Sequence, residues 1–321
     1  MNGAELLSLY QQGNKDFSHA NLSQIQIMQA ELVGIDLSRT ELDWANFSGA
    51  NLSQASFNRA NLSNAQLIKV NLAGAILDNA DLRDTDLSWA NLEQSSLIRA
   101  DLSNANLSQS FFRDANLANA NLNHANLSRA NLSGANLSRA NLKGADLSGV
   151  DLSSADFNQA DLSEANLSGA NLSGANLNRA DLSGSSLRQS NMQQATLQGA
   201  NLRSANLRSV ILTGAVLKES INSSLTTISK LSLTNSRSEN TIDFGSANLT
   251  GANLQGVNLS NANFRFALLF KTNLEKSDLQ NASLIDVYLK GANLRGANLK
   301  NSILKGINWK GTTMPDGSIH P

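Results

Sequence analysis

The sequence offers few residues that could catalyse a reaction or bind a metal ion. It has no cysteine, and its three histidines lie far apart, without a second His or Cys at metal-ligand spacing. The histidines are His19, His124 and His320. Ser and Asp are frequent, but a Ser-His-Asp triad also needs a cleft, which a regular repeat does not form. We therefore expect a protein that is not an enzyme and needs no cofactor.

Charged residues recur at a fixed spacing. Five arginines are separated by multiples of 20 residues: Arg39, Arg59, Arg99, Arg139 and Arg179. Five acids share that spacing: Glu41, Asp81, Asp101, Asp161 and Asp181. Three of the arginines stand two residues before one of these acids, so we expect them to neutralise the acidic column. A solvated surface that resists aggregation explains the arginine column most simply, and a secondary partner-binding surface is the alternative.

These charges belong to a five-residue repeat. Leu, Phe, Ile or Met occupies every fifth position from Phe17 to Leu217, in 41 repeats, and a second array of 14 repeats runs from Phe244 to Trp309. We call this residue the centre of its repeat. Two positions before the centre stands Ala in most repeats, and Asn or Asp usually lies between them. Residues 220–241 interrupt the repeat, shift its phase and are half Ser or Thr.

A period of five matches neither the α-helix, with about 3.6 residues per turn, nor a continuous strand. In an extended segment, residues two apart point to the same side. The Ala and the centre therefore face one way, and the Asn or Asp faces the other. The remaining two residues must turn the chain before the next side. Stacked turns of this kind predict a parallel β-helix with an apolar interior and a polar surface.

The motif Ala-(Asp/Asn)-Leu-X-X, as in ANLSRANLSG at 125–134, resembles that of the pentapeptide repeat family over residues 15–219 and 242–311. The resemblance implies an all-β fold, a right-handed quadrilateral parallel β-helix (solenoid) with four pentapeptides per coil. GNKDF at 13–17 and MPDGSIH at 314–320 are similar to the termini of cyanobacterial members. Those members include a regulator of heterocyst differentiation that binds a transcription regulator. The terminal resemblance implies relatedness more than shared function.

Both ends of the rod are expected to be covered. Asn2 and Glu5 have capping-box spacing and Gly13 suits a helix end, which predicts a short N-terminal helix. The predicted organisation is an N-terminal helical cap at 1–14, a pentapeptide-repeat β-helix at 15–219, a Ser/Thr-rich loop insert at 220–241, a continuation of the β-helix at 242–311 and a C-terminal cap or tail at 312–321.

The candidate site is a group of apolar residues at outward positions near the insert. These are Phe266, Leu268, Phe270 and Tyr288. Exposed apolar groups on a polar rod tend to bind a partner. The insert contributes three further candidates, Ile228, Leu231 and Leu233. Two interpretations stay open with equal weight: the insert covers the apolar group, or it shares that surface with a partner.

A second surface feature is a run of basic residues near the C-terminus. Each follows a centre by one position: Lys290, Arg295, Lys300, Lys305 and Lys310. With four sides per coil they form what we call the basic collar. It would meet an acidic partner, attract nucleic acid weakly, or keep an open end from aggregating. The last interpretation is the simplest.

Composition bounds the function. The net charge of −1 favours neither a nucleic-acid binder nor an acidic mimic, and no apolar run predicts a signal peptide or a membrane span. We expect a cytoplasmic, non-enzymatic scaffold that binds a protein partner, such as a transcription regulator, without membrane or nucleic-acid contact. It would be a monomer or a weak end-to-end dimer. The alternative is a DNA-mimic rod that protects or inhibits a type II topoisomerase, as some relatives do.

Overall fold

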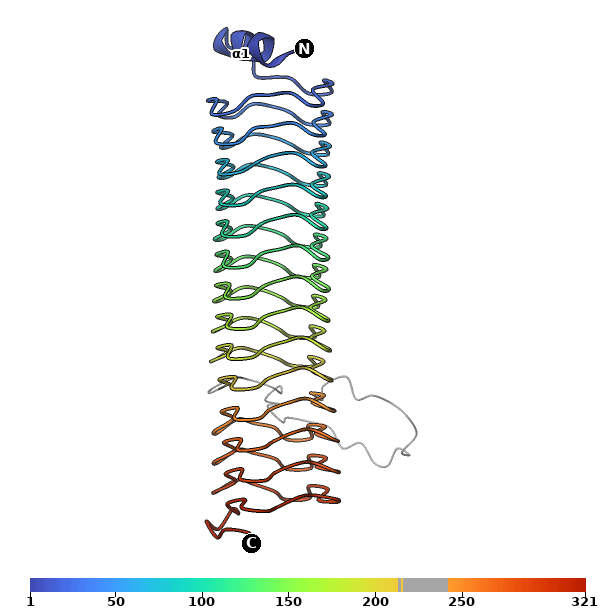
Figure 1. The fold of residues 1–321 in the computed structure, drawn as a ribbon, viewed down its shortest axis with the longest axis vertical. Helices are drawn as coiled ribbons and strands as arrows, with labels where there is room; N and C mark the ends of the chain where they lie inside the picture. The colour runs from blue at the N-terminus through green and yellow to red at the C-terminus, as the bar shows by residue number, and fades with distance from the viewer. Residues whose placement is uncertain (213–214, 216–241) are drawn as a thin grey trace, which may run out of the picture.

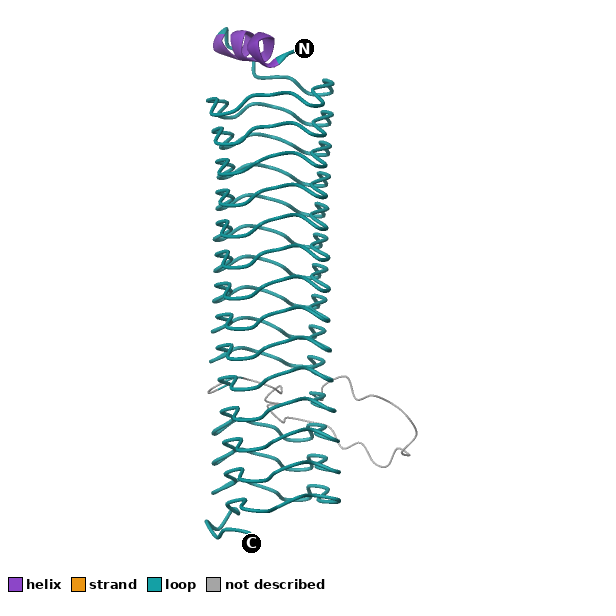
Figure 2. Ribbon diagram, in the orientation of Figure 1, coloured by secondary structure: helices purple, strands orange, loops and turns teal. Residues whose placement is uncertain are grey.

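The structure, a computed structural model, describes residues 1–212, 215 and 242–321. It is a long rod of stacked coils with the two termini at opposite ends (Figure 1). Among the described residues there is one helix, α1 (Gly3–Gln11), and no strand longer than a single bridging residue (Figure 2). Parallel bridges join each coil to the next along the whole rod. The described chain is therefore a solenoid of the β-helix type.

Each coil has four sides. Bridges join a residue to the one 20 positions later, as in Asp16 with Asp36, and neighbouring bridges on one coil are five residues apart. We name the sides faces A, B, C and D, after the columns that start at Asp16, Asn21, Gln26 and Glu31. The bridging residue is the one that precedes each centre. The 20-residue spacing of the arginines thus places them in one column.

The interior is apolar, as predicted. The centres Leu132 and Leu167 are fully buried, and so are the alanines two positions before most centres. Where Ser or Thr replaces that Ala, its hydroxyl is buried and hydrogen-bonded. The Ser185 hydroxyl, for example, donates to the Leu182 carbonyl at 2.7 Å. These hydroxyls find a partner carbonyl in the adjacent corner or, as for Thr272, in the coil before.

The corners explain why the repeat has five residues. At one corner the Ala135 N–H donates to the Leu132 carbonyl at 3.1 Å, and Gly134 has a φ of +69°. A negative φ followed by a positive one marks a type II turn. The Asn131 side chain accepts from the Ser133 N–H at 3.0 Å. The other N–H groups of the pentapeptide donate to carbonyls of the neighbouring coils, so every backbone donor of the repeat has a partner.

The two repeat arrays share the same four faces. Asn201 on face B bridges to Asp243, and Asn206 on face C bridges to Asn248. The rod therefore resumes in register after the interruption. The insert at 220–241 lies outside the described residues. Its nearest described neighbours in the chain, Ala215 on face A and Ile242 on face B, are buried.

The N-terminal end is covered by α1, which confirms the predicted helix. The Asn2 side chain accepts from the Glu5 N–H at 2.9 Å, and the left-handed Gly13 (φ +95°) follows the helix. Leu6 is fully buried. The other three predicted contact residues, Leu7, Leu9 and Tyr10, are partly buried against the same core. The helix thus packs over the first coil and covers its apolar interior.

The C-terminal end is only partly covered by the expected cap or tail at 312–321. Thr313 pairs antiparallel with Ile319, so the tail folds back along face D. The ring of His320 stacks near Trp309, with centroids 6.4 Å apart. Leu304, a centre on face B of the last coil, remains 46% exposed. The tail turns back after one side, so it does not reach face B.

Candidate functional site

The predicted apolar residues form one patch on the C-terminal part of the rod. Leu268 and Tyr288 bridge to each other on face C and are 44% and 50% exposed. Phe266 stands at the corner between faces B and C and is 56% exposed. Phe270 stands at the opposite corner of the same side and is half-buried. The register therefore brings these four residues together, and we call them the apolar patch.

Cations flank the apolar patch on both sides. The Arg265 guanidinium lies 5.9 Å from the centroid of the Phe266 ring, and the Lys271 ammonium lies 5.2 Å from that of Phe270. Both distances fall in the cation–π range. Lys290 is exposed one coil beyond Phe270. The patch is thus apolar at its centre and basic on both edges, and Asp286 is the acid one coil beyond Phe266.

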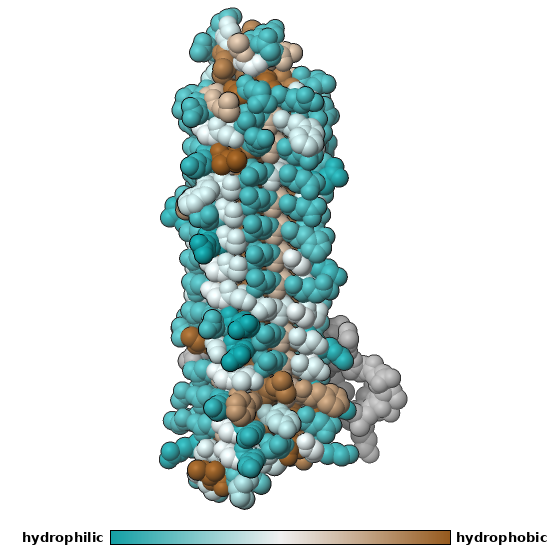
Figure 3. Space-filling model, in the orientation of Figure 1, coloured by the Kyte–Doolittle hydropathy of each residue, from teal (hydrophilic) through white to brown (hydrophobic). Residues whose placement is uncertain are grey.

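The patch is unusual for this surface. The other bridging residues of face C are polar, from Gln26 to Asn308. In the space-filling view, polar columns run along the rod and hydrophobic side chains gather across its C-terminal part (Figure 3). Other exposed apolar side chains, such as Ile76 and Phe111, are bridging residues of faces A and D. At the patch, Phe266, Leu268 and Tyr288 meet on one side.

The three insert candidates, Ile228, Leu231 and Leu233, lie outside the described residues. The flanking Ala215 and Ile242 are on faces A and B, whereas the patch is centred on face C, opposite face A. The shared-surface and covering interpretations of the insert both stay predictions.

The five arginines form a column at the corner between faces A and B, as their spacing predicts. Arg39 and Arg59 line a shallow polar hollow of about 370 Å³ together with His19 and Asp36. The Arg139 side chain donates to Gln159 at 3.0 Å. Among the described residues, none of the five arginines makes an ion pair with a carboxylate within 4.0 Å. The expected neutralisation of the acidic column therefore involves no direct ion pair of these arginines among the described residues.

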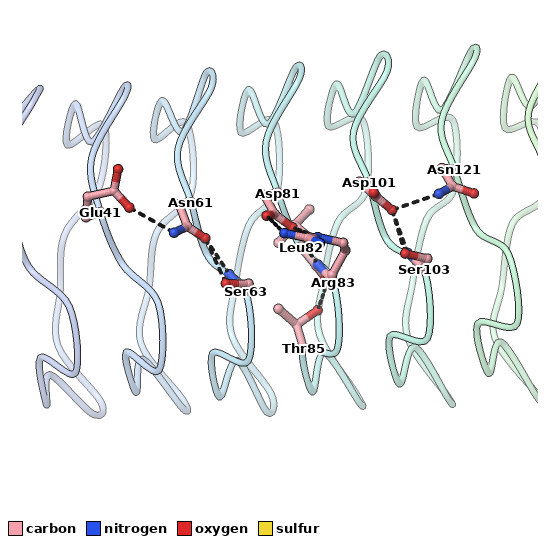
Figure 4. A network of polar contacts seen from close by, with 10 residues as sticks. All are labelled: Glu41, Asn61, Ser63, Asp81, Leu82, Arg83, Thr85, Asp101, Ser103 and Asn121. Atoms are coloured by element: carbon pink, nitrogen blue, oxygen red, sulfur yellow. Dashed lines mark hydrogen bonds and ion pairs between the residues drawn. The ribbon is translucent and has the colours of Figure 1, made fainter.

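The acidic column of face B is held by amides (Figure 4). Glu41 accepts from the Asn61 side chain at 2.8 Å, and Asp101 accepts from Asn121 at 2.9 Å. Two acids differ: among the described residues, Asp161 accepts only from the Ser163 N–H, and Asp81 accepts from the Arg83 guanidinium with both of its oxygens. These hydrogen bonds and the positive charge of Arg83 lower the pKa of Asp81. Asn side chains run along the column, so they reach its acids directly.

Catalytic and metal chemistry finds no support in the described parts of the chain. The three histidines occupy separate regions of the rod, and no group of three His, Cys, Asp or Glu side chains there could hold a metal ion. The hollow beside His19 combines polar groups of both charge signs without a nucleophile activated by a base. No helix in the described part of the chain is long and apolar enough to cross a membrane.

The comparison with family models decides the family. The model of pentapeptide repeats matches residues 16–214 and 242–306 in eight copies. The chain belongs to the pentapeptide repeat family. Members of this family fold as right-handed quadrilateral β-helices. A search of the curated proteins gives no significant match.

Several solved pentapeptide repeat structures are similar to the chain. HetL from the cyanobacterium Nostoc sp. strain PCC 7120, which is involved in heterocyst differentiation regulation, is 31% identical over all of both chains, with a TM-score of 0.30. A protein from the thylakoid lumen of Arabidopsis thaliana is 33% identical over 30% of this chain and 68% of its own, with a TM-score of 0.30. QnrB1, a plasmid-mediated fluoroquinolone resistance protein, is 21% identical over 59% of this chain and 92% of its own, with a TM-score of 0.32.

Sequence reasoning missed one surface, the open part of the last pentapeptide coil. Leu304 is a centre, and the repeat alone predicts that every centre is buried. Ile303 beside it is 52% exposed. The sequence did contain a signal for this surface. After Met314 the five-residue pattern stops, so no further coil can form over faces A and B.

Proposed function

We propose that this chain is a non-enzymatic pentapeptide repeat scaffold that binds a protein partner through the apolar patch. The observation that carries the proposal is the adjacency of Phe266, Leu268, Phe270 and Tyr288 on one exposed side. Aromatic and aliphatic anchors of this kind dominate binding energy at protein interfaces. The polar remainder of the rod would act as a rigid spacer. The proposal includes a cytoplasmic location and a right-handed coil, the latter carried over from the family.

The partner is proposed to be a regulatory protein, such as a transcription regulator. The support is the overall likeness in sequence to HetL, a protein described by its role in heterocyst differentiation regulation. Cations at both edges of the patch favour a partner with acidic residues around its apolar contact. The proposed function requires no binding to a membrane, a nucleic acid or a cofactor.

The charge pattern does not favour the alternative of a DNA-mimic rod. B-DNA carries one charge per about 1.7 Å of its axis. Face B holds five acids over ten coils between Asn21 and Asn201, which is one per roughly 10 Å at about 4.8 Å per coil. Asp81 is in addition neutralised by Arg83. The surface is too sparsely charged to replace a phosphate backbone.

Affinity capture with matched variants tests the proposal. The bait is the full chain, and the lysate comes from its source organism. We expect the double variant Leu268→Ser with Tyr288→Ser to lose the specific partner. The control, Ile76→Ser with Phe111→Ser, removes exposed apolar residues from the same repeat position on other faces and should keep the partner. Circular dichroism establishes that both variants remain folded. Equal capture by both variants would show that the partner binds elsewhere.

A further inference from the structure

The last coil has an unpaired backbone edge. Inside the rod, each centre donates its N–H to the next coil, as Leu132 does to the Asp151 carbonyl at 2.7 Å. In the last coil, the N–H groups of Leu304 to Ile307 have no partner among the described residues, and the corner between them lacks the usual turn bond. Four consecutive donors are therefore free to pair with another extended segment.

The C-terminal tail leaves this edge uncovered. The tail pairs with the last coil on face D, where the Gly311 N–H donates to the His320 carbonyl at 2.9 Å. Figure 1 shows the tail as a small hairpin at the end of the rod. The described residues place nothing over faces A and B of that coil. The open edge comprises residues 299–307.

Apolar side chains accompany the free donors. Leu304 is 46% and Ile303 is 52% exposed, whereas Leu284, the centre one coil earlier, is fully buried. An added strand would cover Leu304 in the same way as the next coil covers other centres. Burial of its exposed apolar surface would favour binding. Hydrogen bonds and apolar contact thus point to the same occupant, an extended chain segment.

The charge around the edge determines what kind of segment fits. Lys300 and Lys305 are exposed at the two corners of the open edge, and none of the basic collar residues makes an ion pair within the described parts. A second copy docked end to end would bring two basic collars together, which electrostatic repulsion disfavours. A segment rich in Glu or Asp would be attracted instead.

We propose that residues 299–307 bind an extended acidic segment of a partner protein by strand addition. The segment pairs with the free N–H groups of the edge, places an apolar side chain over Leu304 and directs its carboxylates to Lys300 and Lys305. This mode gives affinity through the backbone and specificity through alternate side chains. The site is separate from the apolar patch and does not depend on the proposed function.

Fluorescence anisotropy tests the proposal with the full chain and a labelled synthetic peptide. The probe alternates Val and Glu over about eight residues, a usual strand length. We expect it to bind with an affinity that falls with salt. Lys300→Glu with Lys305→Glu should weaken binding at least tenfold. The control Arg203→Glu with Arg208→Glu makes the same charge change at the same repeat position far from the edge and should not.

Three comparisons would overturn the proposal. The first is equal binding of a probe whose edge-facing amides are N-methylated, since backbone pairing would then be unnecessary. The second is equal or tighter binding of a single-stranded oligonucleotide, which would make the collar a nucleic-acid site. The third is absence of probe binding. If light scattering then shows a dimer, a second copy occupies the edge. If it shows a monomer, the lysines only prevent aggregation. Leu268→Ser with Tyr288→Ser should leave probe binding unchanged, which separates this site from the apolar patch.

Discussion

The Asn or Asp before each centre has two roles in the rod. Its side-chain oxygen accepts from the backbone of its own corner, and an Asn amide also donates to the residue one coil earlier. Asn171 shows both, because its oxygen accepts from the Ser173 N–H at 3.3 Å and its amide donates to Asp151 at 3.0 Å. One residue type thus closes the corner and ties neighbouring coils together, which explains its frequency.

Replacement of Asn171 by Ala should lower the free energy of unfolding by about 1–2 kcal/mol. The corner N–H and the Asp151 carboxylate would each lose a hydrogen-bond partner. Guanidinium denaturation of the full chain measures the change. Ser173→Ala serves as the control, since its hydroxyl makes no hydrogen bond among the described residues, and it should be nearly neutral. Equal loss in the two variants would contradict this role for Asn171.

The pair of Asp81 and Arg83 predicts a pH-dependent contribution to stability. Because hydrogen bonding to Arg83 lowers the pKa of Asp81 in the folded state, the pair stabilises the fold above the unfolded-state pKa. That stability is lost as pH falls through the folded-state pKa. Arg83→Ala should therefore lower Tm near neutral pH and have little effect in acid. A Tm difference that stays constant or grows towards acid pH would refute this.

At the scale of the element, the coil tolerates an insertion because its corners lie on the surface. The bridge from Asn201 to Asp243 shows that the interruption does not change the register of the faces. Without the 22 residues 220–241, Leu217 and Phe244 would be five positions apart, the normal spacing of centres. The repeat on either side thus has no need of the insert for its own hydrogen bonding.

Deletion of residues 220–241 should leave the circular dichroism spectrum and Tm close to those of the full chain. If the insert shares the recognition surface, the deletion should abolish partner capture. Phe266→Ser with Phe270→Ser provides the companion variant in the same assay. Capture that survives both changes would place the site elsewhere, and the column from Arg39 to Arg179 would become the next candidate.

For the whole molecule, the uniform repeat builds a stiff polar rod, and its ends differ. Helix α1 covers one end, whereas the other keeps a free edge with basic residues around it. The two surfaces proposed for binding both lie in the C-terminal third. We therefore expect the N-terminal coils to set distance and rigidity rather than specificity.

The sparse charge of the rod predicts no competition with DNA. In a supercoiling assay with a type II topoisomerase, submicromolar protein should not inhibit the enzyme, because the acids of face B are too far apart and partly paired. A known DNA-mimicking pentapeptide repeat protein provides the positive control. Inhibition at submicromolar concentration would show that the charge argument is wrong.

Much of this architecture could be predicted from the sequence. The five-residue period requires buried Leu and Ala, exposed Asn and polar corners, because side-chain direction in an extended segment is a local property. The period also located the change of phase at 220–241, and the capping-box spacing of Asn2 and Glu5 located the helix before the first coil. Outward positions identified all four residues of the apolar patch.

Other features depended on the tertiary structure, because they involve residues one coil apart or beyond the repeat. Asp81 pairs with Arg83, whereas Glu41, Asp101 and Asp181 accept hydrogen bonds from Asn side chains one coil later, and the spacing alone does not reveal these partners. The 20-residue bridges decided that the patch centres on face C. The free edge at Leu304 arose because the tail folds back on face D, a long-range pairing that no local pattern encodes.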